Sequence, residues 1–438
     1  MRHTSRKPVK SFFSRVILIL IIVVMGAGCG PEAQETPEPD PNTAEAPAQI
    51  QVDQTAVFSP TAPDPTLTPA NTEAPEPIGV ILFIGDGMGG AHRQAAAWMG
   101  YGKEGKLAMD GLQVFGSLST TAVGKMVTDS AAAATAMASG VKTRNGLVGL
   151  SPDHEELFTS LDRAQELGLA VGLVTNTQLP HATPAAFAAH AENRWDMAWI
   201  APQLLDAEVN VLLGGGENFF LPAGSQGCHP EPGKREDGRD LTEEAREAGY
   251  RTICQPDELA AIDPSETDRL LGVFADEGMP RPFSPTLAEM TETAVKVLSR
   301  DPEGFFLVVE SGQIDWASHG NAAYNAIQDT LALDEAVQVG LDYAEDHPNS
   351  LLIVTADHET GGMSVHSQPT GKPEEDGPFT GPDDFVFYVT WTTDTHTDMD
   401  VPVSAQGPGA ALLAGRHENT QVFPAVMTAL SGQTYLEK

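Results

Sequence analysis

Short apolar runs alternate with helix-like stretches along most of this 438-residue chain, and this alternation restricts its fold more than any other feature. The apolar runs have the length and composition of buried strands; they cover residues 80–84, 171–175, 209–213, 305–309 and 351–355. The stretches that favour helix cover residues 130–139, 160–167, 242–247, 286–299 and 326–344. Such alternation predicts an α/β fold, a three-layer α/β/α sandwich with a central, mostly parallel sheet.

The N-terminal part of the chain has a different character. Basic residues precede an apolar run and the small residues before Cys29, which predicts a signal peptide over residues 1–28. The stretch before Cys29 is similar to a bacterial lipoprotein signal and predicts a lipid on this cysteine. Because Gly26 stands where Leu is usual, ordinary cleavage and an uncleaved anchor stay open. Residues 29–77, rich in Pro, Thr, Glu and Ala, predict a linker.

These features predict an extracytoplasmic protein held at the cell membrane only through its N-terminus, with a folded domain over residues 78–438. Within it, residues 217–283 break the alternation, and we interpret them as a small insertion or cap. This segment contains Cys228 and Cys254. An even pair of cysteines in an exported protein predicts a disulfide, and two separate buried thiols are the alternative.

The charge of the chain limits its partners. It has 25 basic and 61 acidic residues, for a formal net charge of −36. Such a chain is unsuited to binding nucleic acid or anionic lipid headgroups. An anionic substrate would require local cations, from metal ions or arginine, to reverse the sign of the potential at the site.

Acidic and imidazole side chains follow the predicted strands, where the sites of open α/β sheets form; they are Asp86, His181, Glu310, Asp315, His319, Asp357 and His358. Carboxylates brought together in this way repel one another unless cations lie among them, which predicts a site for several divalent metal ions. The glycines around Asp86 also match a dinucleotide-binding pattern. That reading is weak, because Asp86 would face a pyrophosphate of like charge.

Ser130 begins a predicted helix, directly after Val127-Thr128-Asp129. A serine at this position is most often only a helix cap. The positive end of the helix also favours an anion, and an adjacent metal ion would activate the hydroxyl without a histidine base. Ser130 is therefore a candidate nucleophile.

The motifs that carry these residues resemble the alkaline phosphatase family in order, spacing and residue type, over residues 80–435. They are VILFIGDGMG, VTDSAAAATAMASGVKTRNG, HATPAAFAAHAENR, FFLVVESGQIDWASH, TADHETGG and the HT…VPVSAQGPGA stretch. The resemblance implies hydrolysis of small phosphate monoesters through a phosphoserine, with two zinc ions and one magnesium ion. Members are often dimers and monomers also occur, so a homodimer stays open.

The resemblance also implies a role for each site residue. It assigns the nucleophile to Ser130 and the grip on two phosphate oxygens to Arg194, whose planar guanidinium suits them. It assigns one zinc to Asp315, His319 and His396, the second zinc to Asp86, Asp357 and His358, and magnesium to Asp86, Thr183 and Glu310. His181 and Trp316 are expected in the outer shell.

Two other functions are weighed against this one. The first is another hydrolase of the same superfamily, such as a phosphodiesterase or a sulfatase; Arg194 favours monoesters, because a diester has one free oxygen fewer than a monoester. Alanines after Ser130 also depart from the sulfatase pattern. The second is a non-catalytic surface lipoprotein that binds phosphate or metal, which the complete set of expected ligands disfavours.

Overall fold

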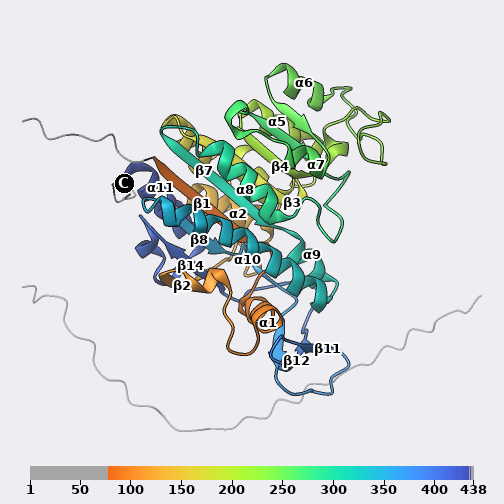
Figure 1. Ribbon diagram of the computed structural model, residues 1–438, viewed down its shortest axis with the longest axis vertical. Coiled ribbons are helices and arrows are strands. Elements are labelled where there is room, and N and C mark those ends of the chain that lie inside the picture. Colours follow the sequence, from red (N-terminus) through yellow and green to blue (C-terminus); the bar gives the residue numbers. More distant parts are fainter. Residues whose placement is uncertain (1–76, 434, 436–438) are drawn as a thin grey trace, which may run out of the picture. The chain divides into compact units, whose positions relative to one another are not determined.

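The computed structural model describes residues 77–433 and 435. The predicted signal peptide, the lipidation site Cys29 and nearly all of the linker lie outside these residues. Helices and strands alternate through the described part of the chain, from β1 near its start to α11 near its end (Figure 1). No helix among the described residues combines the length and apolar character that a bilayer crossing requires.

Within the described residues a ten-stranded sheet forms the centre of the fold. Its strands follow one another across the sheet in this order: β15 (Gly415–Glu418), β2 (Val114–Ser119), β14 (Val401–Gln406), β8 (Leu351–Thr355), β1 (Ile78–Gly85), β7 (Gly304–Ser311), β3 (Ala170–Gln178), β4 (Val211–Gly215), β6 (Leu270–Val273) and β5 (Arg251–Ile253). Neighbours pair in parallel except at β14, which runs antiparallel to both β2 and β8. The predicted mostly parallel sheet is therefore confirmed.

Helices cover both faces of this sheet. Two of them, α8 (Leu287–Leu298) and α10 (Ala323–Asp346), pack together in front of the sheet in Figure 1. The opposite layer contains α2 (Ser130–Ser139), α3 (Ser160–Glu166), α4 (Ala182–Ala188) and α11 (Val422–Ser431). Because neither face meets solvent, the central strands β3, β7 and β8 are buried at every residue, which explains their continuous apolar sequences.

The remaining helices lie at the ends of the strands or beside the sheet edge; they are α1 (Gly90–Tyr101), α5 (Met197–Asp206), α6 (Leu241–Glu247), α7 (Pro256–Ala260) and α9 (Gln313–His319). Two small sheets accompany them. One is antiparallel and consists of β10 (Ser364–His366), β12 (Val386–Thr390) and β11 (Glu375–Thr380). The other pairs β9 (Glu359–Thr360) with β13 (His396–Thr397).

The sequence predicted the centre of the fold more closely than its edges. Each predicted strand overlaps an observed one, and the predicted helix 130–139 coincides with α2. The prediction for 217–283 as an insertion or cap misses part of its structure, because β6 and β5 from this segment extend the main sheet by parallel pairing. Both strands are short, so neither produces a long apolar run.

Cys228 and Cys254 form a disulfide, with their Cα atoms 6.3 Å apart and a separation of 26 positions in sequence. The bond ties the irregular chain after β4 to the residue that follows β5. It therefore closes the one long stretch of 217–283 that has little regular structure of its own.

We predict that Cys228→Ser lowers the free energy of unfolding by about 3 kcal/mol, because opening a loop of this length frees the unfolded chain. Denaturant titration of the variant and the parent measures the difference. Adding Cys254→Ser to the first substitution should change little more. An equal further loss would mean that each cysteine stabilises the fold by its own packing.

Candidate active site

Three buried carboxylates meet at the ends of adjacent parallel strands. Asp86 directly follows β1, Glu310 lies near the end of β7, and Asp357 comes two residues after β8. In the sheet, β1 lies between β8 and β7, with Ile84 paired to both Thr355 and Glu310. All three acids are 0% exposed. The convergence that the sequence predicted is thus produced by the strand order itself.

Ser130 is the first residue of α2, and it is 1% exposed. The side chain of Asp129 caps this helix by accepting a hydrogen bond from the backbone N–H of Ala132 at 3.0 Å. The Ser130 hydroxyl lies 3.2 Å from Nε2 of His358. Its position combines the positive end of a helix with immediate contact to the acidic cluster.

His358 directs one nitrogen at several oxygens. Its Nε2 lies 3.4 Å from Oδ1 of Asp86, 3.2 Å from Oδ2 of Asp357 and 3.2 Å from Oγ of Ser130. Asp357 is held by backbone N–H groups of Gly87 and His358, both of which donate to its Oδ1. This leaves Oδ2 of Asp357 facing the imidazole, so Asp86, Asp357 and His358 form one candidate metal group.

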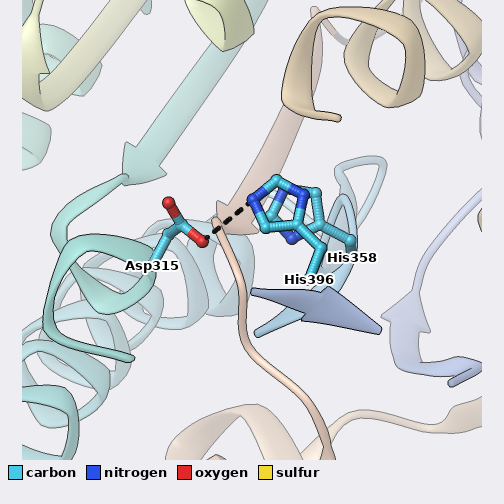
Figure 2. A group of neighbouring side chains, drawn as sticks. All are labelled: Asp315, His358 and His396. Atoms are coloured by element: carbon cyan, nitrogen blue, oxygen red, sulfur yellow. Dashed lines mark ion pairs between the residues drawn. The ribbon is translucent and has the colours of Figure 1, made fainter. Parts of the chain in front are cut away.

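A second candidate group contains Asp315, His358 and His396. Figure 2 shows the two imidazole rings stacked beside the Asp315 carboxylate; their centroids are 3.6 Å apart. Nε2 of His396 lies 3.5 Å from Oδ1 of Asp315. His319 adjoins this group, with its Nε2 3.1 Å from Nε2 of His396 and 3.3 Å from Oδ2 of Asp315. The predicted set Asp315, His319 and His396 is thus brought together.

The hydrogen bonds of Nδ1 fix the tautomers of His319 and His396. Nδ1 of His396 lies 2.9 Å from the carbonyl oxygen of Thr128, and Nδ1 of His319 lies 2.6 Å from that of Asp394. A carbonyl oxygen only accepts, so both Nδ1 atoms carry a proton. When both rings are neutral, their Nε2 lone pairs face each other and Asp315, an arrangement that suits a bound cation.

His358 is oriented in the same way through Thr360. The Thr360 hydroxyl donates to Oδ1 of Asp315 at 2.5 Å, so its oxygen can accept from Nδ1 of His358 at 3.2 Å. Nε2 of His358 is left with its lone pair toward the carboxylates of Asp86 and Asp357. Three imidazoles thus present metal-ligating nitrogens to one acidic cluster.

A third candidate group consists of Asp86, His181 and Glu310. Oε2 of Glu310 accepts hydrogen bonds from Thr175 at 2.5 Å and Thr177 at 3.1 Å, which leaves Oε1 toward the group. Thr183, expected as a ligand here, is also fully buried at the start of α4. His181, which was expected in an outer shell, belongs to this candidate group as the N-cap residue of α4.

Several oxygens in these groups are buried and accept no hydrogen bond from the described residues; they are Oδ1 and Oδ2 of Asp86, Oδ2 of Asp357 and Oε1 of Glu310. Buried polar atoms nearly always have partners. Unpartnered carboxylate oxygens beside oriented imidazole nitrogens fit divalent cations in both ligand chemistry and charge.

The pKa values of the cluster reflect repulsion among its buried carboxylates. Burial, followed by the charge of Asp357, raises the pKa of Asp86 well above its ordinary value. Burial, reinforced by the charge of Asp315, raises the pKa of Asp357 to about 7. The hydrogen bond with Asp315 raises the pKa of His319 to about 9, so a proton on His319 neutralises part of the cluster. Metal binding would displace this proton.

Arg194 is the buried cation beside the cluster, with 7% of its surface exposed. Its guanidinium lies 3.3 Å from Oδ2 of Asp129 and 3.3 Å from Nε2 of His181. Asp129 thus caps the helix that begins with Ser130 and also anchors Arg194. Sequence reasoning did not assign a role to Asp129 or Thr360, although each is a neighbour of a predicted ligand or nucleophile within a quoted motif.

Trp316 lies on α9 next to Asp315, and it is half-buried. Its ring approaches that of His181 edge-on, with centroids 6.1 Å apart. It therefore borders the third group through His181.

Comparisons with known proteins agree with this geometry. A family model described as alkaline phosphatase matches residues 79–375. Alkaline phosphatase 3 of Bacillus subtilis is 33% identical over 427 residues, covering 80% of this chain and 88% of the relative. Streptomycin-6-phosphate phosphatase of Streptomyces griseus is 36% identical over 425 residues, covering 83% and 93%.

A solved alkaline phosphatase from the Antarctic bacterium TAB5 has the same fold, with a TM-score of 0.70 and 28% identity over 81% of this chain and 98% of that chain. A variant of that enzyme in which Glu replaces a histidine, with Mg bound in its M3 site, matches with a TM-score of 0.70 and 29% identity over the same shares.

We predict that Asp357→Asn stabilises the metal-free protein increasingly as the pH rises from about 4 to about 7. In the folded parent Asp357 stays protonated over this window, whereas in the unfolded chain it ionises near pH 4. The stability that the parent has when Asp357 is protonated in both states is therefore full below about pH 4 and is lost as the pH rises through 7. Asparagine cannot ionise. The difference in unfolding free energy should grow by about 2–4 kcal/mol across the window.

Denaturant titrations of both proteins in excess chelator at several pH values measure this difference, and the titrating histidines common to both proteins cancel. Zinc added at neutral pH should stabilise the parent more than the variant. A difference that does not change with pH would contradict the assigned burial of an ionisable Asp357.

Proposed function

Because the chain belongs to the alkaline phosphatase family and is a phosphomonoester hydrolase, we propose that Ser130 is the nucleophile and forms a phosphoserine. One observation carries this proposal. The Ser130 hydroxyl lies at a helix N-terminus, 3.2 Å from Nε2 of His358, a residue shared by two of the candidate metal groups. Both the helix end and bound cations favour an anion at this point.

The proposed metals are two zinc ions and one magnesium ion. Imidazole and carboxylate ligands suit zinc, and oxygen ligands suit magnesium. One zinc would be held by Asp315, His319 and His396, the second by Asp86, Asp357 and His358, and magnesium by Asp86, Thr183 and Glu310, with His181 at the same group. When bound, these ions would lower the pKa of the serine hydroxyl and of water and would neutralise the charge that develops on the phosphoryl group.

The proposed reaction has two steps, formation of the phosphoserine and its hydrolysis. The Ser130 oxygen forms a bond to phosphorus as the bond from phosphorus to the ester oxygen breaks, and the proton of the serine hydroxyl ends on the leaving alcohol. Water next forms a bond to phosphorus, and the bond to Ser130 breaks. One proton of this water returns to the serine oxygen, and inorganic phosphate leaves.

Arg194 would bind two of the phosphate oxygens that do not react. Its guanidinium is planar, buried and already oriented by Asp129 and His181. A monoester has three non-bridging oxygens, so two can bind Arg194 while the third faces the proposed metal ions, whereas a diester has only two in all. The residue therefore supports monoesters over the phosphodiesters that related hydrolases cleave.

We propose further that the protein acts outside the cytoplasm, tethered through Cys29. The basic and apolar N-terminal segment and the Pro-rich stretch that follows it support this location. A homodimer is also consistent with the family, and sedimentation of the purified protein would measure it.

We predict that Ser130→Ala lowers kcat for p-nitrophenyl phosphate by at least about a thousandfold, because the covalent step requires the hydroxyl. The assay uses protein supplied with zinc and magnesium at alkaline pH, and it is repeated after chelation, which should also abolish turnover. Bis-p-nitrophenyl phosphate serves as the diester control.

Each contrary outcome has a definite meaning. Faster hydrolysis of the diester would assign the chain to the phosphodiesterases. Undiminished activity of Ser130→Ala would mean that another group attacks phosphorus. Metal binding without hydrolysis of either substrate would favour a non-catalytic binding protein.

We predict that Trp316→Lys binds inorganic phosphate several-fold more tightly than the parent. An ammonium group beside the phosphate site adds an attraction that an indole lacks. The inhibition constant for phosphate measures the effect, and kcat should fall if phosphate release limits turnover. Tighter inhibition of the parent would refute this view of Trp316.

A further inference from the structure

Trp195 is an exposed aromatic residue directly beside the buried Arg194. Its side chain is 66% exposed, whereas Arg194 is 7% exposed. The guanidinium carbon of Arg194 lies 5.0 Å from the centroid of the Trp195 ring. A phosphate bound by Arg194 would therefore lie near this indole.

A second tryptophan borders the same position. The His181 ring lies between Trp195 and Trp316, with centroid distances of 6.4 Å and 6.1 Å and near-perpendicular planes. Trp316 is fixed from behind by Gly278, where even a Cβ atom would come within 2.5 Å of its ring. Trp316 is therefore held in place by its neighbours, whereas Trp195 is exposed.

Trp199 provides a useful contrast, because it is equally exposed at 66%. Its indole N–H donates to the carbonyl oxygen of His190 at 3.3 Å, and it contacts neither Arg194 nor His181 in the described chain. A single exposed apolar ring is ordinary at a protein surface, so exposure alone assigns no role to either residue. Trp195 differs from Trp199 because it adjoins Arg194 and His181, where the proposed substrate would bind.

Charge restricts what that partner carries. Glu192 and Asp196, on either side of the Arg194–Trp195 pair in sequence, are both exposed. With the net charge of −36, they disfavour a leaving group that bears additional negative charge. Exposed aromatic rings favour planar partners that stack on them.

We propose that Trp195 is a specificity-determining residue that stacks on the leaving group, and that the enzyme prefers monoesters of neutral, planar aromatic alcohols. This inference rests on the proposed function, since it requires Arg194 to hold the phosphate. Arg194 is held by Asp129 and His181 as well as by the Trp195 ring, so a change at Trp195 should alter the choice of leaving group far more than the binding of phosphate.

Calorimetric titration of the metal-loaded protein with phenylphosphonate and methylphosphonate tests this directly, because neither compound is hydrolysed. The parent should bind phenylphosphonate about tenfold more tightly than methylphosphonate. Trp195→Ala should lose most of this preference while its affinity for methylphosphonate stays within about twofold. Trp195→Phe should retain much of it, and Trp199→Ala, the matched control, should retain all of it.

Three results would overturn the inference. The first is a phenyl preference that survives in Trp195→Ala. The second is an equal loss of affinity for both phosphonates in that variant, which would mean that Trp195 only positions Arg194. The third is the same loss of preference in Trp199→Ala. If the parent binds neither phosphonate and fails to hydrolyse phenyl phosphate, the proposed function itself fails and the inference fails with it.

Discussion

Mutual repulsion among buried carboxylates is the constraint on which the rest of this structure depends. Asp86, Glu310 and Asp357 are fully removed from water at adjacent strand ends, and Asp315 lies beside them. Without cations, the cluster retains protons at a pH where carboxyl groups are ordinarily ionised, as the raised pKa values of Asp86 and Asp357 express. Such an arrangement stores unfavourable electrostatic energy in the folded state, and bound divalent ions convert it into affinity.

The fold holds these acids in place through several independent supports. Parallel pairing sets the spacing of Asp86 and Glu310, since the strands that carry them are hydrogen-bonded neighbours. Backbone N–H groups fix one oxygen of Asp357. Carbonyl oxygens fix the ring orientation of His319 and His396. The cluster is therefore rigid before any ion arrives, so little reorganisation is needed on binding.

The sequence contained enough information for the central strands and for nearly every candidate ligand. Buried parallel strands leave long apolar runs, and acids placed directly after such runs have few explanations other than a site. The short strands β5, β6 and β15 left no such run, and the antiparallel β14 could not be ordered in the sheet from its own residues. The sequence also could not decide whether His181 lies among the ligands or beside them, because this depends on distances that only packing determines. Thr360 and Asp129 were missed because a threonine or a capping aspartate has an ordinary structural role in most proteins.

The pairing of β13 with β9 has a consequence for how the protein comes into being. This two-residue contact brings His396 beside His358, and His396 also bonds through its imidazole to the backbone of Thr128. Ser130 and the candidate ligands other than His396 all come earlier in the sequence, so His396 is the last of them to be synthesised. A nascent chain therefore carries the other acids and imidazoles before it has the residue that completes the Asp315 group. A chain terminated before residue 396 would lack this imidazole, and it would also lack β14, which joins β2 to β8 in the sheet, together with β15 and α11.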